Sequence, residues 1–145
     1  MSFLGNVIWI VFGGLWMAIG WLLAGVLMAV TIVGIPWSRS CFTLAQYSLA
    51  PFGKTVIPRS DLTGKEDLGT GTLGLVGNVV WFVLAGIWLA IGHVLAAILT
   101  ACTIIGIPLA WQHLKLALLS LAPVGMTVVT IREAQLIEER NGRMV

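Results

Sequence analysis

The stretch TIVGIPWSRS, from Thr31 to Ser40, recurs 72 residues later as TIIGIPLAWQ, from Thr103 to Gln112. The surrounding residues match at the same fixed offset without a gap. Such a repeat indicates an internal duplication in which each copy forms the same structural unit. We therefore expect two repeats, 5–57 and 77–129, separated by a polar linker, 58–76, and followed by a charged C-terminal tail, 130–145.

The composition is typical of an integral membrane protein. Hydrophobic residues make up 59% of the chain and charged residues only 10%, with a mean hydropathy of +1.01. A soluble domain of this size could not bury so much apolar surface. No charge occurs from Val7 to Trp37, and His93 is the only basic or acidic side chain from Leu73 to Gln112. Both runs exceed the roughly 20 residues that span hydrocarbon.

The Gly-Ile-Pro motif predicts the end of one helix and the start of another. Gly34 and Gly106 suit the left-handed conformation that ends many helices. Pro36 and Pro108 suit the first turn of a new helix, because proline has no N–H to leave unpaired there. Each repeat is therefore expected to contain two helices joined at this break.

The lengths of these helices differ. Asn6 and Asn78 are expected to cap first helices of about 24 to 27 residues, which are long enough to cross a bilayer with tilt. The second helices would end at Pro51 and Pro123, after about 15 residues or roughly 22 Å. The sequence therefore predicts an all-α membrane protein in which each repeat has a long transmembrane helix and a short second membrane helix.

The short second helix leaves the topology open. It could cross the bilayer as the return arm of a hairpin, lie at the interface, or be re-entrant and shielded by neighbouring helices. The positive-inside rule favours the hairpin, with both termini and the linker cytoplasmic. The basic residues behind this choice lie mainly in the linker and tail, with only two near the break: Lys54, Arg59, Lys65, Arg132, Arg140 and Arg143, against Arg39 and Lys115.

Segments outside the membrane carry their own signals. KTVIP and MTVVTI end the two repeats with β-branched residues and are expected to pair as a two-stranded ribbon. REAQLIEERNGR in the tail is expected to form a short helix. The fold thus adds short cytoplasmic β and helical extensions to the membrane helices.

Three paired motifs resemble a known family. GNVIWIVFGGLWMAIG matches GNVVWFVLAGIWLAIG, GIP matches GIP, and SLAPFGKTV matches SLAPVGMTV. In these motifs the chain resembles the YccF family, small bacterial inner-membrane proteins built from two YccF domains. The resemblance covers both repeats. It implies a fold class and a location in the inner membrane, and it implies no particular biochemical activity.

Small residues form a stripe along one face of each long helix. Such a stripe lets helix backbones approach closely in lipid. It would serve either to pack one repeat against the other or to form a homo-oligomer interface. The stripe residues are Gly14, Ala18 and Gly25 in the first repeat and Gly86, Ala90 and Ala97 in the second.

Four basic or titratable residues are candidates for a ligand or ion pathway: Arg39, His93, His113 and Lys115. A histidine near the middle of a membrane helix is a functional candidate, although a neutral histidine bonded to a backbone carbonyl is an alternative. The membrane part has no Asp or Glu. If an ion permeates, this favours a small inorganic anion over a cation. The two longer bases could instead reach headgroup phosphates.

Other function classes fit poorly. No nucleophile has a neighbouring acid–base pair, so we expect no enzymatic activity, and no motif predicts a cofactor or a metal. Cys41 and Cys102 are expected to be free, buried thiols. A net charge of +2 gives no reason to expect nucleic acid. Two hypotheses remain: a homo-oligomeric, anion-preferring channel in the lipid bilayer, or a non-conducting scaffold or accessory subunit.

Overall fold

Each repeat folds as a helical hairpin followed by a short strand. The computed structural model describes residues 2–32 and 34–142. The first repeat comprises α1 (Ser2–Trp9), the π-helical segment η1 (Ile10–Gly14), α2 (Leu15–Val30), α3 (Ile35–Leu49) and β1 (Lys54–Pro58). The second comprises α5 (Gly71–Trp81), the π-helical segment η2 (Phe82–Gly86), α6 (Ile87–Ala101), α7 (Ile107–Leu121) and β2 (Met126–Thr130). The remaining helices are α4 (Arg59–Thr63) in the linker and α8 (Ile131–Arg140) in the tail.

The predicted fold class is confirmed. Two long apolar helical stretches, Phe3–Val30 and Gly71–Ala101, precede the two Gly-Ile-Pro turns. In each, only 28% of the most apolar part is buried, which is low for the core helix of a soluble protein. The short second helices, the ribbon and the tail helix also form as expected.

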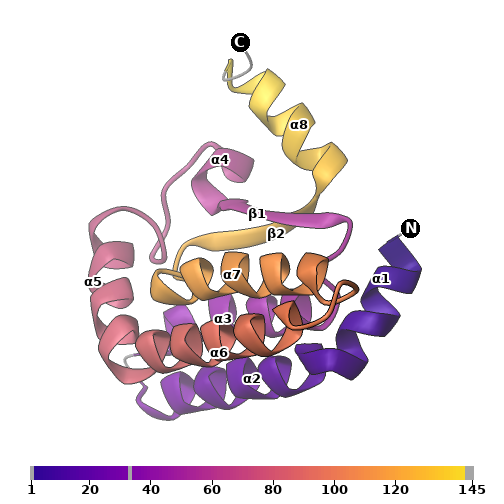
Figure 1. Cartoon of the computed structure of the whole chain (residues 1–145). Coiled ribbons are helices and arrows are strands. Elements are labelled where there is room, and N and C mark those ends of the chain that lie inside the picture. Colours follow the sequence, from indigo (N-terminus) through magenta and orange to yellow (C-terminus); the bar gives the residue numbers. More distant parts are fainter. Residues whose placement is uncertain (1, 33, 143–145) are drawn as a thin grey trace.

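Neither long stretch is a straight rod, because a π-helical segment interrupts each one. In the first repeat the irregularity is sharp, since Gly13 has φ 148° and ψ −22° inside η1. Only glycine adopts this backbone region without strain. Figure 1 shows the result: α1 runs at a steep angle to α2, and α5 at a steep angle to α6. The sequence did not predict this bend.

The Gly-Ile-Pro turns differ from the expected left-handed cap. Gly34 and Gly106 have φ of −79° and −76°, and the second helices already begin at the isoleucine that follows each glycine. The glycines are needed for space instead. A Cβ on Gly34 would meet the Met28 carbonyl oxygen, and one on Gly106 would meet that of Thr100. Pro36 and Pro108 lie in the first turns of α3 and α7.

The expectation that Asn6 and Asn78 cap helices is wrong, because both lie inside helices. Each side-chain amide instead forms two hydrogen bonds with the backbone of one distant residue. Asn6 Nδ2 donates to the Phe52 carbonyl over 3.2 Å and its Oδ1 accepts from the Phe52 N–H over 3.0 Å. Asn78 holds Val124 in the same way, at 3.2 and 2.9 Å. The two amides thus join the start of each repeat to its end.

The repeats are related by a pseudo-two-fold axis. Its position follows from equivalent residues of the two copies, 72 apart in sequence, that contact each other. Val56 pairs with Val128 at the centre of the antiparallel ribbon. Trp21 Nε1 lies 3.3 Å from His93 Nε2, where α2 passes α6. A point where equivalent residues meet lies on the axis that relates the copies. The axis therefore runs from the ribbon to the crossing of α2 and α6.

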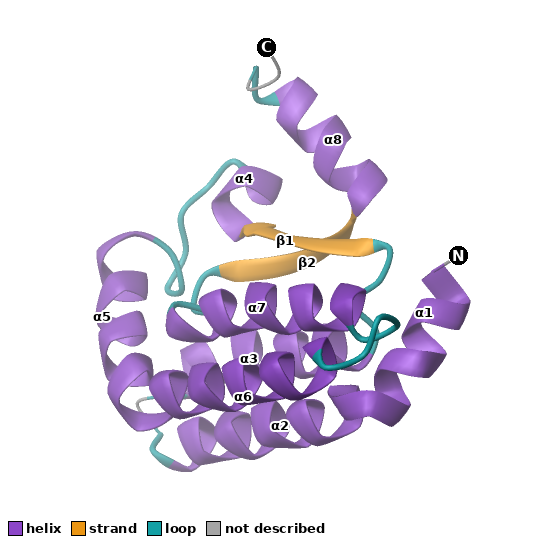
Figure 2. Ribbon diagram, viewed as in Figure 1, coloured by secondary structure: helices purple, strands orange, loops and turns teal. Residues whose placement is uncertain are grey.

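The elements form layers along this axis (Figures 1 and 2). The ribbon lies on top, α3 and α7 form the next layer, and α2 and α6 form the last. Helices α2 and α6 lie across the axis in opposite directions, while α1 and α5 flank the layers on opposite sides. The outer surface of the α2–α6 layer is apolar, with exposed side chains such as Leu23, Val26, Leu95 and Ile98.

The linker is ordered by one ion pair. Arg59 Nε and Asp67 Oδ2 lie 2.6 Å apart, and a second bond of 2.7 Å joins Arg59 Nη2 to Asp67 Oδ1. The Arg59 hydrogen bond lowers the pKa of Asp67 to about 2. Asp67 also accepts from the Gly69 N–H, so it positions the turn that leads into α5.

We expect the Asn78→Ala substitution to destabilise the fold strongly. It leaves an N–H and a carbonyl of Val124 without partners, at a cost of about 1–3 kcal/mol for each buried group. Thermal unfolding of the purified protein in detergent should show a clear drop in Tm. The matched Asn6→Ala change should have a similar effect, and Gln46→Ala, at an exposed position of α3, should have almost none. Equal Tm values for all three variants would contradict the role of the amides.

Candidate functional site: a buried histidine and tryptophan cluster

Two tryptophans at equivalent positions hold the hairpins closed. Trp9 Nε1 donates to the Ser48 carbonyl over 2.6 Å, and Trp81 Nε1 donates to the Ser120 carbonyl over 2.7 Å. Both rings are fully buried. Each bond ties a first helix to the C-terminal end of the second helix of its own repeat, where the last carbonyls lack helical partners.

The small residues of the predicted stripe make this packing possible. A Cβ at Gly14 would meet the Trp9 ring, and one at Gly86 would meet the Trp81 ring. Gly25 lies against Cys41 and Phe42 of α3. The other three members of the stripe, Ala18, Ala90 and Ala97, are buried as well. The stripe therefore packs inside the protomer, and its residues are not on the surface.

The centre of the cluster is a chain of three rings that begins at the axis. Trp21 donates from Nε1 to His93 Nε2 over 3.3 Å, and His93 Nδ1 lies 3.1 Å from His113 Nδ1. Indole can only donate, so Nε2 of His93 must be the acceptor. A neutral His93 then carries its proton on Nδ1 and donates it to His113. His113 in turn carries its proton on Nε2.

This order of protons leaves one donor unpaired. His113 Nε2 is one of two buried side-chain polar atoms without a hydrogen-bond partner among the described residues, and Ser48 Oγ is the other. The His113 ring packs on Trp9, with centroids 4.3 Å apart. Its Nε2 faces Gly13, where a Cβ would lie 3.1 Å away. The bend in the first repeat therefore makes room for His113.

Further aromatic contacts enclose the chain of rings. Trp21 stacks on Trp81 with centroids 5.4 Å apart and an interplanar angle of 11°. Gln112 Nε2 donates to the Tyr47 hydroxyl over 3.0 Å, which joins α7 to α3. These rings fill the space between the two hairpins along the axis.

The structure brings together two of the four predicted pathway residues. His93 and His113 are fully buried and adjacent. Arg39 and Lys115 are exposed on α3 and α7, and Lys115 Nζ lies 6.0 Å from the centre of the Trp111 ring. The hydrogen-bond partners of His93 are the side chains of Trp21 and His113 and not a backbone carbonyl, which was the alternative.

The cysteines fall into two environments. Cys41 is fully buried, as expected, whereas Cys102 is exposed at the end of α6. The expectation that both are buried is therefore wrong for Cys102. No group of three or more His, Cys, Asp or Glu residues that could hold a metal ion is found in residues 2–32 and 34–142.

Sequence reasoning missed the tryptophans of the cluster. Trp9 and Trp81 are fully buried, so they are packing residues. Their spacing to Ser48 and Ser120 is 39 residues in both copies. That shared spacing is the only sequence signal for the bond, and it identifies no partner until the hairpin geometry is known.

Fold and site together define a class: a duplicated helical membrane protein whose two copies enclose a buried aromatic cluster. The family model described as "Inner membrane component domain" matches this chain twice, over residues 4–54 and 76–126. The chain belongs to this family, the YccF family.

Curated relatives agree with this assignment. Two proteins named "Inner membrane protein YccF", from Escherichia coli (strain K12) and Shigella flexneri, are each 37% identical to the chain over 140 residues. The alignments cover 95% of this chain and 94% of each relative. No solved structure matches the chain. The protein is thus an inner-membrane protein of the YccF family.

The order of protons in the cluster predicts unequal effects for its two histidines. His93→Phe leaves both the Trp21 N–H and His113 Nδ1 unpaired, whereas His113→Phe leaves only the His93 N–H unpaired. At about 1–3 kcal/mol per unpaired buried group, His93→Phe should lower the Tm in detergent more. Adding Trp21→Phe to His93→Phe should cost less than Trp21→Phe alone, because the orphaned N–H is removed. Additive losses would show that the bond contributes nothing.

Proposed function

We propose that this protein is a non-conducting scaffold that is inserted into the inner membrane from its cytoplasmic face. In this proposal α2 and α6 lie deep in the bilayer, α3 and α7 lie nearer the headgroups, and the ribbon, α4 and α8 lie in water. The observation that carries it is the layering along the pseudo-two-fold axis. Because α2 and α6 lie across that axis, they cannot both cross a bilayer whose normal follows it.

The distribution of charge supports this orientation. Every described acidic residue lies in the linker or in α8, at the ribbon end of the axis. The described basic residues follow the same pattern except for Arg39 and Lys115, which are exposed on the middle layer. Basic side chains on that layer can reach lipid phosphates. With the axis in the plane of the bilayer, the charged ribbon end would instead lie in hydrocarbon, which is costly.

The Gly-Ile-Pro turns are also suited to hydrocarbon. Ile32, Ile104 and Ile105 are 76%, 88% and 72% exposed, and no charged residue lies within either turn. The threonine hydroxyl of the first turn is paired locally. Thr31 Oγ1 donates to the Met28 carbonyl over 2.6 Å and accepts from the Gly34 N–H over 3.2 Å. A turn with satisfied polar groups and an apolar surface needs no water around it.

The depth of insertion fits less than a full bilayer. Helix α1 has 8 residues and η1 has 5. At 1.5 Å per residue they descend about 20 Å, against a hydrocarbon thickness of about 30 Å. The chain thus enters, runs across the membrane plane as α2, and returns as α3.

The packed interior supports a non-conducting role. The axis is occupied by Trp21 and His93, and the neighbouring rings of His113, Trp9 and Trp81 are fully buried. An ion crossing a single protomer would have to displace these rings. The water-facing surface is the part available to other proteins, and α8 presents Ile131 and Leu136, which are 50% and 56% exposed. A partner protein that binds this end would be held at the membrane.

Cys102 is a native reporter of this topology. Because it lies at the end of α6 beside the turn, we expect it to stay unlabelled by a membrane-impermeant maleimide added to either side of intact inner-membrane vesicles. A thiol in hydrocarbon is out of reach of a reagent that stays in water. The same thiol should react after the protein is unfolded in SDS.

A cysteine placed in the linker, Lys65→Cys, is the matched control. It should react from the cytoplasmic side only. Labelling of Cys102 from the periplasmic side would show that the turn reaches the far surface, and the one-sided insertion would then be wrong.

A second candidate is a homo-oligomeric pore that prefers small inorganic anions. It is favoured by one observation: Arg39 and Lys115 are exposed on α3 and α7, with no carboxylate on any described membrane helix. Since the protomer is filled along its axis, the pore would lie between protomers. Bases without neutralising acids attract anions.

The pore hypothesis makes its own prediction. Proteoliposomes should show chloride flux, and Arg39→Glu or Lys115→Glu should reduce it at least severalfold or reverse the preference between chloride and potassium. Gln46→Glu places a carboxylate elsewhere on α3 and serves as the control. Absence of flux in the unchanged protein at any voltage or pH favours the scaffold. Flux with unaltered selectivity in both variants removes these two residues from the pathway.

A further inference from the structure

Among the differences between the two repeats near the turns, Trp37 of the first repeat corresponds to Leu109 of the second. Trp37 fills the space between α3 and α5. Its ring atoms lie 2.7 to 2.8 Å from where a Cβ at Gly77 would be, and its Nε1 donates to the Leu68 carbonyl over 3.3 Å. Only 8% of Trp37 is exposed. The first turn is therefore sealed against the helix that packs beside it.

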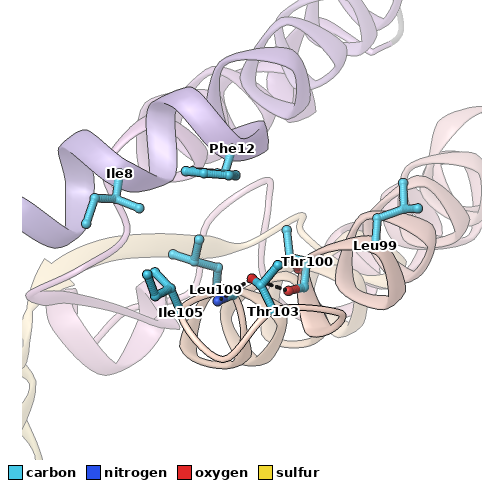
Figure 3. A pocket seen from close by; sticks show the side chains of 8 residues that line it. Ile8, Phe12, Leu99, Thr100, Thr103, Ile105 and Leu109 are labelled. Atoms are coloured by element: carbon cyan, nitrogen blue, oxygen red, sulfur yellow. Dashed lines mark hydrogen bonds between the residues drawn. The ribbon is translucent and has the colours of Figure 1, made fainter.

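The second turn lacks this seal. Gly5 of α1 is the counterpart of Gly77, and the three atoms nearest to its Cβ position all belong to Phe52. Leu109 is smaller than tryptophan, and it lines a cavity here. A cavity of about 480 Å³ lies between α1, η1 and the second turn, as Figure 3 shows, with Ile8 and Phe12 on one side and Leu99, Ile105 and Leu109 on the other.

The walls of this cavity offer no free polar group. Its two threonines are already bonded: Thr100 Oγ1 donates to the Ala96 carbonyl over 2.8 Å, and Thr103 Oγ1 accepts from the Gly106 N–H over 3.0 Å. The remaining side chains on the wall are hydrocarbon or aromatic. The volume lies within the range of about 300–1,000 Å³ that is typical of ligand pockets. An occupant must therefore be apolar along the whole length that enters.

The mouth of the cavity opens onto the apolar surface of the membrane part. Phe12, Leu99 and Ile105 line it and are 59%, 74% and 72% exposed. This surface is continuous with the outer face of α6. In an inner-membrane protein the molecules in contact with such a surface are lipids, whose acyl chains are long, apolar and flexible.

We infer that this cavity beside the second turn binds one acyl chain of a membrane phospholipid, and that no acyl chain binds beside the first turn. There the Trp37 indole packs against α5 instead. The inference depends on membrane insertion alone, so it stands whether the protein is a scaffold or a pore.

The test uses the whole protein in vesicles that contain a phosphatidylcholine with a photoactivatable diazirine in one acyl chain. After irradiation, mass spectrometry maps the adducts. We expect these adducts to be enriched at least fivefold at Ile8 and Leu109, which are largely withdrawn from the surface. The comparison is with Val80, the counterpart of Ile8 in the second repeat. Adducts at the openly exposed Leu23 provide the reference for ordinary lipid contact.

Two substitutions exchange the local structure of the repeats. Leu109→Trp should abolish the enrichment at Ile8 and raise the Tm, because the indole fills the space. Trp37→Leu should raise the adducts at Val80, which is 38% exposed, above their level in the unchanged protein. Leu95→Trp adds an indole at an exposed position of α6 and should change neither pattern. Leu109→Phe serves as a smaller filling variant, since Phe52 lies near the place that the indole would take.

The outcomes separate cleanly. Loss of the Ile8 adducts in either filling variant, with the Leu23 adducts retained, supports a bound acyl chain. Adducts that are no more frequent at Ile8 than at Val80, or that persist in both filling variants, would overturn the inference. Trp37→Leu keeps the test informative even if neither filling variant folds.

Discussion

Hydrocarbon offers no hydrogen-bond partner, so every backbone group left over at a bend, turn or helix end in this fold must be paired from within the chain. The structure meets this constraint with side chains at the same positions in both copies. Indoles of Trp9 and Trp81 hold helix-end carbonyls, and amides of Asn6 and Asn78 hold both polar groups of one distant residue. These six long-range bonds, three in each repeat, make each repeat a closed unit.

Closure of each repeat explains where the small residues are needed. A tryptophan that must reach a carbonyl on the neighbouring helix crosses the backbone of its own helix one turn later, and only glycine leaves room there. Gly14 and Gly86 occupy that position. The π-helical segments end at the same two glycines. Close packing and the bend of the first helix thus belong to one local arrangement, since both bring the helix toward the end of its hairpin partner.

Much of the fold followed from the sequence, because its signals were local or repeated. The duplication, the turn at Pro36 and Pro108, the ribbon and the tail helix are read from neighbouring residues. The wrong helix-cap assignment and the missed partners of His93 share one cause, which is that the partner residues are distant in sequence. Asn78 has the chemistry of a helix cap, and only the three-dimensional fold places Val124 within its reach. Likewise His93 was a clear candidate, but its partners come from the crossing of two helices, which no periodicity predicts.

The Trp21 and His93 pair shows why the copies had to diverge at the axis. A residue on a two-fold axis meets its own counterpart, so a buried side chain that must hydrogen-bond there needs a counterpart with the complementary group. Two tryptophans cannot do so, because indole donates and does not accept. A histidine opposite a tryptophan supplies the acceptor, and its second nitrogen then needs an acceptor of its own. His113 provides that acceptor from the position at which the first repeat has Cys41, so two copy-specific histidines satisfy one donor on the axis.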